Sequence, residues 1–118
     1  MVITRSDKDT EYQKIISMKE KYPDRAICYI QREEKCCLLP KLDKNRFLIP
    51  LEMPLIQVIS IIRKRLKIDG QATQAMFLFI GENRKIYPAG TLMGTLYDNE
   101  RSEDQMLYIY YNAENTFG

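Results

Sequence analysis

The residue types that could carry out chemistry in this chain are few. Its three cysteines are Cys28, Cys36 and Cys37, and it contains no histidine. Without histidine, Ser-His and Cys-His nucleophilic catalysis is excluded, and most transition-metal sites lose a principal ligand. An odd number of cysteines with one adjacent pair is not a disulfide framework, and their spacing completes no zinc site. The sequence therefore favours buried or idle thiols, with no metal and no cofactor, and it gives little support to a hydrolase.

The last residue, Gly118, offers a different kind of chemistry. Glycine makes up about 7% of average sequences, so a terminal glycine alone is a weak signal. However, a residue without Cβ leaves its carbonyl unhindered and lets a tail enter a narrow active site. Gly118 is therefore a candidate acyl donor, whose carboxyl group would be adenylated, held as a thioester and passed to an amine. Residues 112–118 are polar and unpatterned, so we expect a mobile tail there.

The rest of the chain must form the body that carries this tail. With 118 residues, of which 45% are apolar, the chain is long enough for one compact domain. Its apolar runs are too short to cross a bilayer, and residues 1–10 lack the apolar segment of a signal peptide. The sequence therefore predicts a soluble cytosolic protein.

The net charge of +2 is unevenly distributed. Basic side chains outnumber acidic ones between Lys41 and Lys67, whereas acidic ones are in excess from residue 68 onward. Such a central basic band indicates an acidic partner or a phosphate surface. Composition alone favours the simpler interpretation, a solvated face.

The first half of the chain predicts a helix and two strands. Thr10 and Gln13 have the spacing of a capping box, so a helix is expected to begin there and to end near Tyr22. Residues 27–32 are β-branched and aromatic, which is typical of a strand. Residues 46–49 form a second strand, and the proline that follows it indicates that this strand lies at a sheet edge or ends there.

The clearest element is a helix over Leu55–Ile68. Its apolar residues recur at helical spacing and predict one buried face, and Gly70 is expected to supply the left-handed cap that ends the helix. The apolar stripe consists of Leu55, Val58, Ile59, Ile62 and Leu66. Ile61 lies off this stripe, so one flank of the helix is expected to be covered by something other than the core.

The second half adds two strands and a short helix. Residues 76–80 are a continuous apolar run, typical of a strand buried on both faces. Residues 91–97 predict a short helix, and residues 105–111 a last, central strand. Two strands, a helix lying across them and two further strands make a β-grasp arrangement, which is an α+β fold.

Several segments resemble the autophagy ubiquitin-like modifiers, the family of microtubule-associated light chain 3 and the GABA-receptor-associated protein. They are Lys21-Tyr22-Pro23-Asp24-Arg25, residues 42–50 (LDKNRFLIP), Ile61-Ile62-Arg63-Lys64-Arg65-Leu66, residues 107–111 (LYIYY) and Thr116-Phe117-Gly118. The resemblance implies a ubiquitin-like β-grasp over residues 26–111, an N-terminal helical extension over residues 1–25, and a flexible tail over residues 112–118.

The chain departs from this family in its first helix. Lys8, Asp9, Glu11 and Tyr12 stand where the family usually has an aromatic residue and paired basic residues. Lys14 stands where the family has an acidic residue, and Ile27 replaces the usual proline of the first strand.

The resemblance implies that the chain is not an enzyme. It implies a modifier that is conjugated through Gly118 to phosphatidylethanolamine and acts in autophagosome formation. The expected partners are ubiquitin-like activating and conjugating enzymes, a processing or deconjugating cysteine protease, and cargo receptors; nucleic acid is not expected. The chain would occur in the cytoplasm and, held peripherally by its covalent lipid, on the autophagosome membrane.

The same resemblance implies a surface that binds aromatic-x-x-aliphatic peptide motifs. Such a peptide would add to residues 46–49 as a further strand, with alternate side chains entering two pockets. The aromatic pocket would use Met18, Ile27, Lys44, Arg46, Leu48 and Met106. The aliphatic pocket would use Phe47, Ile49, Pro50, Met53, Val58, Ile61 and Ile62. Lys44 and Arg46 would meet acidic residues that flank the motif.

Two other functions remain open from the residues alone. The terminal glycine equally permits a ubiquitin-like modifier that is attached to proteins. The basic band permits a small nucleic-acid-binding domain, which would need exposed aromatic side chains among its basic residues and would lose affinity steeply with salt. Only Phe47 and Tyr29 could serve as those aromatic residues, so this last alternative is the weakest.

Overall fold

The computed structural model of the chain describes residues 2–36, 38–68 and 76–113, with residues 2–10 described by their backbone alone. The elements follow in the order α1 (Val2–Lys21), β1 (Arg25–Arg32), β2 (Arg46–Pro50), α2 (Leu55–Arg65), β3 (Phe77–Ile80), α3 (Met93–Glu100) and β4 (Leu107–Asn112). This is the order that the sequence predicted, and it confirms the α+β fold.

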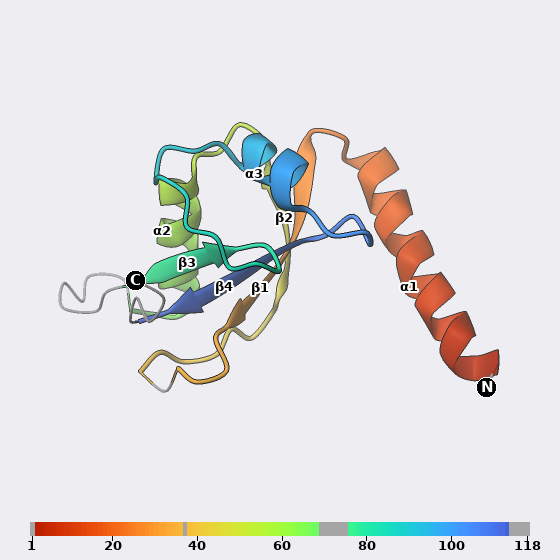
Figure 1. The fold of residues 1–118 in the computed structure, drawn as a ribbon, viewed down its shortest axis with the longest axis horizontal. Helices are drawn as coiled ribbons and strands as arrows, with labels where there is room; N and C mark the ends of the chain where they lie inside the picture. Colours follow the sequence, from red (N-terminus) through yellow and green to blue (C-terminus); the bar gives the residue numbers. More distant parts are fainter. Residues whose placement is uncertain (1, 37, 69–75, 114–118) are drawn as a thin grey trace.

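The four strands form one mixed sheet in the order β2-β1-β4-β3 (Figure 1). β1 pairs with β2 in an antiparallel manner, from Arg25 opposite Pro50 to Tyr29 opposite Arg46. β1 and β4 are parallel neighbours at the centre, and β3 pairs with β4 in an antiparallel manner. β2 is therefore an edge strand, as the proline at its end predicted, and β4 is central, also as predicted.

β3 was expected to be buried on both faces, and this is correct for most of its length. Leu78, Phe79 and Ile80 are buried, whereas Phe77 at the start of the strand is exposed. The strand achieves this burial at the other edge of the sheet, where it has one neighbouring strand.

The main core lies between one face of the sheet and helix α2. Alternate residues of β1 and β4 point into it, including Cys28, Ile30, Leu107 and Ile109. Burial raises the pKa of the Cys28 thiol far above its ordinary value, which suits an unreactive core side chain. Cys36 is buried too, whereas Cys37 lies outside the described residues.

Helix α2 buries most of the predicted stripe but ends earlier than expected, and Ile59 packs against the core while remaining partly accessible. Leu55, Val58 and Ile62 are buried in the core, and Leu66 follows them there as the C-cap residue. The left-handed cap is Lys67, with φ of 62°, and the N–H of Ile68 donates to the carbonyl of Arg63, as in a Schellman motif. The prediction that Gly70 caps this helix was therefore wrong, because the chain turns three residues earlier.

The two other helices also differ from their predicted bounds. α1 begins at Val2, so Thr10 lies inside the helix and is not its N-cap. α3 runs over Met93–Glu100, where residues 91–97 were predicted, because its first turn is anchored by backbone bonds from Met93 and Gly94 to the loop after β2. None of the described helices is long and apolar enough to cross a membrane.

Helix α1 lies on the opposite face of the sheet from α2. A second, smaller core of Ile15, Ile27 and Met106 joins α1 to β1 and to the start of β4. Figure 1 shows α1 as a long helix at one side of the β-grasp body, beside the loop between α3 and β4, with its N-terminus pointing away. This second core brings α1 next to the strand edge that the sequence singled out.

Candidate functional site

The candidate site is centred on the edge strand β2. Within the described residues β2 pairs with β1 alone, so its other edge faces no strand. Side chains alternate along it as predicted: Leu48 joins the second core beneath α1, whereas Phe47 and Ile49 join the main core beneath α2. An edge strand of this kind can accept a further strand through main-chain hydrogen bonds.

A pocket of about 610 Å³ opens beside this strand, between α1 and the sheet. It is lined by Glu11, Tyr12, Ile15, Tyr29, Arg46, Asp104, Met106 and Tyr108. Its residues come from four segments far apart in the sequence, namely α1, β1, β2 and the region from the α3–β4 loop into β4. The walls combine apolar and aromatic side chains with a few charged groups, which is the usual character of a site for an aromatic anchor.

The residues predicted for the aromatic pocket fall into three positions. Arg46 and Met106 line the pocket. Met18, Ile27 and Leu48 belong to the same apolar cluster as Met106 and support it from beneath, with Ile27 fully buried. Lys44 is exposed outside the pocket.

The residues predicted for the aliphatic pocket are divided between core and surface. Ile49, Val58 and Ile62 are buried members of the main core. Phe47 and Met53 pack against that core and remain partly accessible, Ile61 is half-buried, and Pro50 is exposed. The accessible part of this set consists of Phe47, Pro50, Met53 and Ile61, which come from β2, the loop after it and α2.

The sequence did not single out most of the residues that line the pocket. Tyr29 and Tyr108 face each other across β1 and β4, with ring centroids 5.8 Å apart. Strand alternation could have found them, because both flank positions that point into the main core. Asp104 had no such signal, since its place depends on the turn of the α3–β4 loop.

Asp104 holds two other residues of the pocket wall in place. Its carboxylate accepts hydrogen bonds from the Tyr108 hydroxyl, at 2.5 Å, and from the Met106 backbone N–H, at 2.9 Å. Burial, followed by this hydrogen bond, raises the pKa of Tyr108, so the phenol stays neutral and keeps donating at neutral pH. The two bonds fix the pocket residue Met106 relative to the loop.

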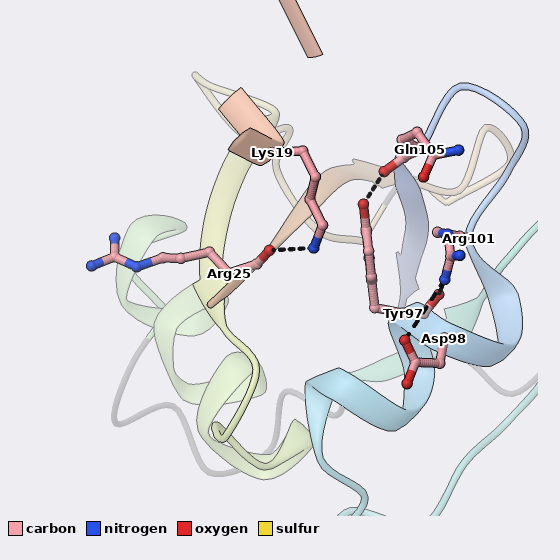
Figure 2. A network of polar contacts seen from close by, with 6 residues as sticks. All are labelled: Lys19, Arg25, Tyr97, Asp98, Arg101 and Gln105. Atoms are coloured by element: carbon pink, nitrogen blue, oxygen red, sulfur yellow. Dashed lines mark hydrogen bonds and ion pairs between the residues drawn. The ribbon is translucent and has the colours of Figure 1, made fainter. Parts of the chain in front are cut away.

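A polar network holds α1 near α3 and the same loop (Figure 2). The Lys19 ammonium lies 4.4 Å from the centroid of the Tyr97 ring and donates to the Arg25 carbonyl at 3.4 Å. The Tyr97 hydroxyl donates to the Gln105 carbonyl at 2.5 Å. The network therefore links the end of α1 to the loop that carries Asp104 and Met106.

No group of three or more His, Cys, Asp or Glu side chains that could hold a metal ion occurs among residues 2–36, 38–68 and 76–113. Gly118, the predicted acyl donor, lies outside the described residues.

The β-grasp sheet with α2 across one face defines a ubiquitin-like protein. The model of the family described as "Autophagy protein Atg8 ubiquitin like" matches residues 8–118. The chain is 37% identical over 118 residues to Autophagy-related protein 8e of Arabidopsis thaliana, an alignment that covers 98% of this chain and 93% of that protein. It is 39% identical over 109 residues to Autophagy-related protein 8 of Schizosaccharomyces pombe, covering 92% of this chain and 84% of that protein.

The chain therefore belongs to the Atg8 family of autophagy ubiquitin-like proteins. The family resemblance that the sequence suggested is confirmed. As a member of this family the chain is a ubiquitin-like modifier and adaptor of autophagy and not an enzyme.

Proposed function

We propose that the chain is conjugated through Gly118 to phosphatidylethanolamine and, on the autophagosome membrane, binds cargo receptors that carry aromatic-x-x-aliphatic motifs. The observation that carries the binding proposal is the outer edge of β2, which pairs with no strand among the described residues and lies beside the pocket that Arg46 and Met106 line. The family match, which continues to residue 118, supports the conjugation proposal. The partners would be the activating and conjugating enzymes and a cysteine protease that processes or deconjugates the tail.

The peptide would extend the sheet at β2, with its two anchors entering on either side of the strand. The aromatic side chain would enter the pocket between α1 and the sheet, against Met106 and Tyr108. The aliphatic side chain would contact the accessible surface of Phe47, Met53 and Ile61. Two buried anchors normally dominate the free energy of such binding, while the main-chain bonds set the register.

Deletion of Gly118 tests the conjugation proposal. Because the acyl donor is lost, the variant should form no lipid adduct and should not collect on membranes in cells, while its circular dichroism and peptide affinity should be unchanged. Mass spectrometry of the wild-type adduct identifies the amine. A lipid-modified deletion variant would refute the proposal, and an adduct formed only with protein lysines would support the alternative, a modifier of proteins.

Two matched substitutions on α2 test the binding proposal. A Trp-x-x-Leu peptide with acidic residues before the tryptophan should bind the wild type with micromolar affinity, about −8 kcal/mol. Ile61→Glu should weaken this binding by at least about tenfold, because it places an unpaired charge against the aliphatic anchor. Ile56→Glu is the control, since Ile56 is 52% exposed on the same helix, and it should change the affinity by less than about twofold.

Isothermal titration calorimetry measures both variants, and their circular dichroism spectra establish that they fold. If Ile61→Glu folds and binds the peptide as the wild type does, the aliphatic anchor does not use this surface.

A further inference from the structure

The Arg46 guanidinium already has a carboxylate partner within the chain. Glu11 on α1 forms an ion pair with it through one carboxylate oxygen and the Nη2 of Arg46. The two side chains are 46% and 37% exposed, so water reaches both. Pairs of this kind contribute little net stability and can exchange partners.

The ion pair leaves the Arg46 side chain only partly satisfied. Its Nε is buried and, within the described part of the chain, has no hydrogen-bond partner. A guanidinium binds a carboxylate best when two neighbouring N–H groups donate in parallel. Glu11 contacts only one nitrogen of the Arg46 guanidinium. This ion pair is therefore weaker than the two-nitrogen interaction that a carboxylate can make with arginine.

The other nearby carboxylate is committed elsewhere. Asp104 lines the same pocket, but its two oxygens accept bonds from the Tyr108 hydroxyl and the Met106 N–H. Glu11 is therefore the pocket carboxylate that faces Arg46 across the space between α1 and β2. An acidic residue of an incoming peptide would compete with Glu11 for the Arg46 guanidinium.

We propose that Glu11 is an internal competitor for Arg46, which makes the site selective for motifs that carry several acidic residues before the aromatic anchor. This inference rests on the proposed peptide binding. A peptide with one acidic residue that takes Arg46 from Glu11 exchanges one ion pair for another, so its net gain at Arg46 is small. Further carboxylates can contact Lys44, which is exposed and close along the chain, so a multiply acidic flank gains the larger net attraction.

The experiment compares two Trp-x-x-Leu peptides, one with three acidic residues before the tryptophan and one with three asparagines, on three folded proteins: wild type, Glu11→Gln and Glu20→Gln. Glu20 is exposed on the same helix α1, so its substitution changes the net charge identically. Affinities are measured by calorimetry at about 0.05 M and 0.5 M salt.

Glu11→Gln should bind the acidic peptide about threefold more tightly than the wild type at low salt, which is about 0.65 kcal/mol. The gain should shrink at high salt, where exposed charges are screened within about 5 Å. The wild type and Glu11→Gln should bind the asparagine peptide equally, because that peptide has no carboxylate to compete with Glu11 for Arg46. Glu20→Gln should leave both affinities within about 1.5-fold of the wild type.

Each contrary outcome has a distinct meaning. If Glu11→Gln and Glu20→Gln raise the affinity for the acidic peptide equally, the effect is one of net charge, and the proposal that Glu11 competes for Arg46 is wrong. Weaker binding of the acidic peptide by Glu11→Gln would overturn it as well, since Glu11 would then assist the peptide. If the wild type binds neither peptide, the proposed peptide binding is wrong, and the proposed competition by Glu11 is wrong with it.

Discussion

Tyr97 shows how a single side chain can shape a distant pocket. Its ring is 2% exposed and lies between the Lys19 ammonium, at 4.4 Å, and the Arg101 guanidinium, at 5.3 Å from its centroid. Its hydroxyl binds the carbonyl of Gln105, whose φ of 72° is a left-handed conformation that a non-glycine residue adopts at a cost. This hydrogen bond (Figure 2) stabilises the turn, and the turn carries Asp104 and Met106, which line the pocket.

At the scale of single residues, the sequence predicted some of these positions but not the contacts between them. Tyr97 falls within the short helix that the sequence predicted, and Met106, one of the residues predicted for the aromatic pocket, lines the pocket beside β2. The contact between Lys19 and Tyr97 joins residues on two separate helices, so no local sequence pattern predicts it. The ion pair between Glu11 and Arg46 could not be predicted either, because a charged residue on a helix is ordinarily solvated.

At the scale of elements, the end of helix α2 gives a direct test. Lys67 occupies the C′ position with φ of 62°, a conformation in which a residue with a Cβ pays about 1–2 kcal/mol that glycine does not. Lys67→Gly should therefore raise the free energy of unfolding by about 0.5–1 kcal/mol, after the larger entropy of the unfolded glycine is subtracted.

Lys64→Gly is the matched control, because Lys64 is exposed inside the same helix. It should lower the free energy of unfolding by about 1 kcal/mol. Urea unfolding of the two variants measures both changes. Destabilisation by Lys67→Gly would mean that the lysine side chain, and not its backbone conformation, stabilises the end of the helix.

This helix also shows how far the sequence determines the elements. Apolar spacing correctly predicted that α2 buries Leu55, Val58 and Ile62, because burial against a sheet requires one apolar face. Its end was misplaced because glycine is the usual left-handed residue, whereas here lysine adopts that conformation. The start of α1 was misplaced for a related reason: a capping-box pattern is local, and the helix continues through it.

At the scale of the whole molecule, one sheet separates two apolar cores of different size. The main core beneath α2 contains most of the buried side chains and belongs to the ubiquitin-like body. The second core has three buried members, Ile15, Ile27 and Met106, and the candidate pocket opens directly beside it. The attachment of α1 and the shape of the pocket therefore depend on the same few contacts.

Three tyrosines that are buried or partly buried set the pH above which the molecule loses stability. Burial raises the pKa of Tyr97, Tyr108 and Tyr111 above the ordinary value near 10, and the hydrogen bond to Asp104 raises that of Tyr108 further. A raised folded-state pKa means that the folded protein holds these protons more tightly than the unfolded chain does. Their contribution to stability is thus complete below about pH 10 and is lost as the pH rises through the folded-state values.

We expect the free energy of unfolding to fall above about pH 10, and Tyr108→Phe to make that fall shallower. Each such tyrosine can contribute a slope of at most about 1.4 kcal/mol per pH unit, because the unfolded chain has lost a proton that the folded protein keeps. Urea unfolding at half-unit steps from pH 9 to 11 measures the slope. Tyr12→Phe, which removes a hydroxyl from a side chain that is 44% exposed, is the control and should leave the slope unchanged. A Tyr108→Phe variant that loses stability equally at every pH would show that its hydroxyl acts only through packing and hydrogen bonding, and that its ionisation does not set the alkaline limit.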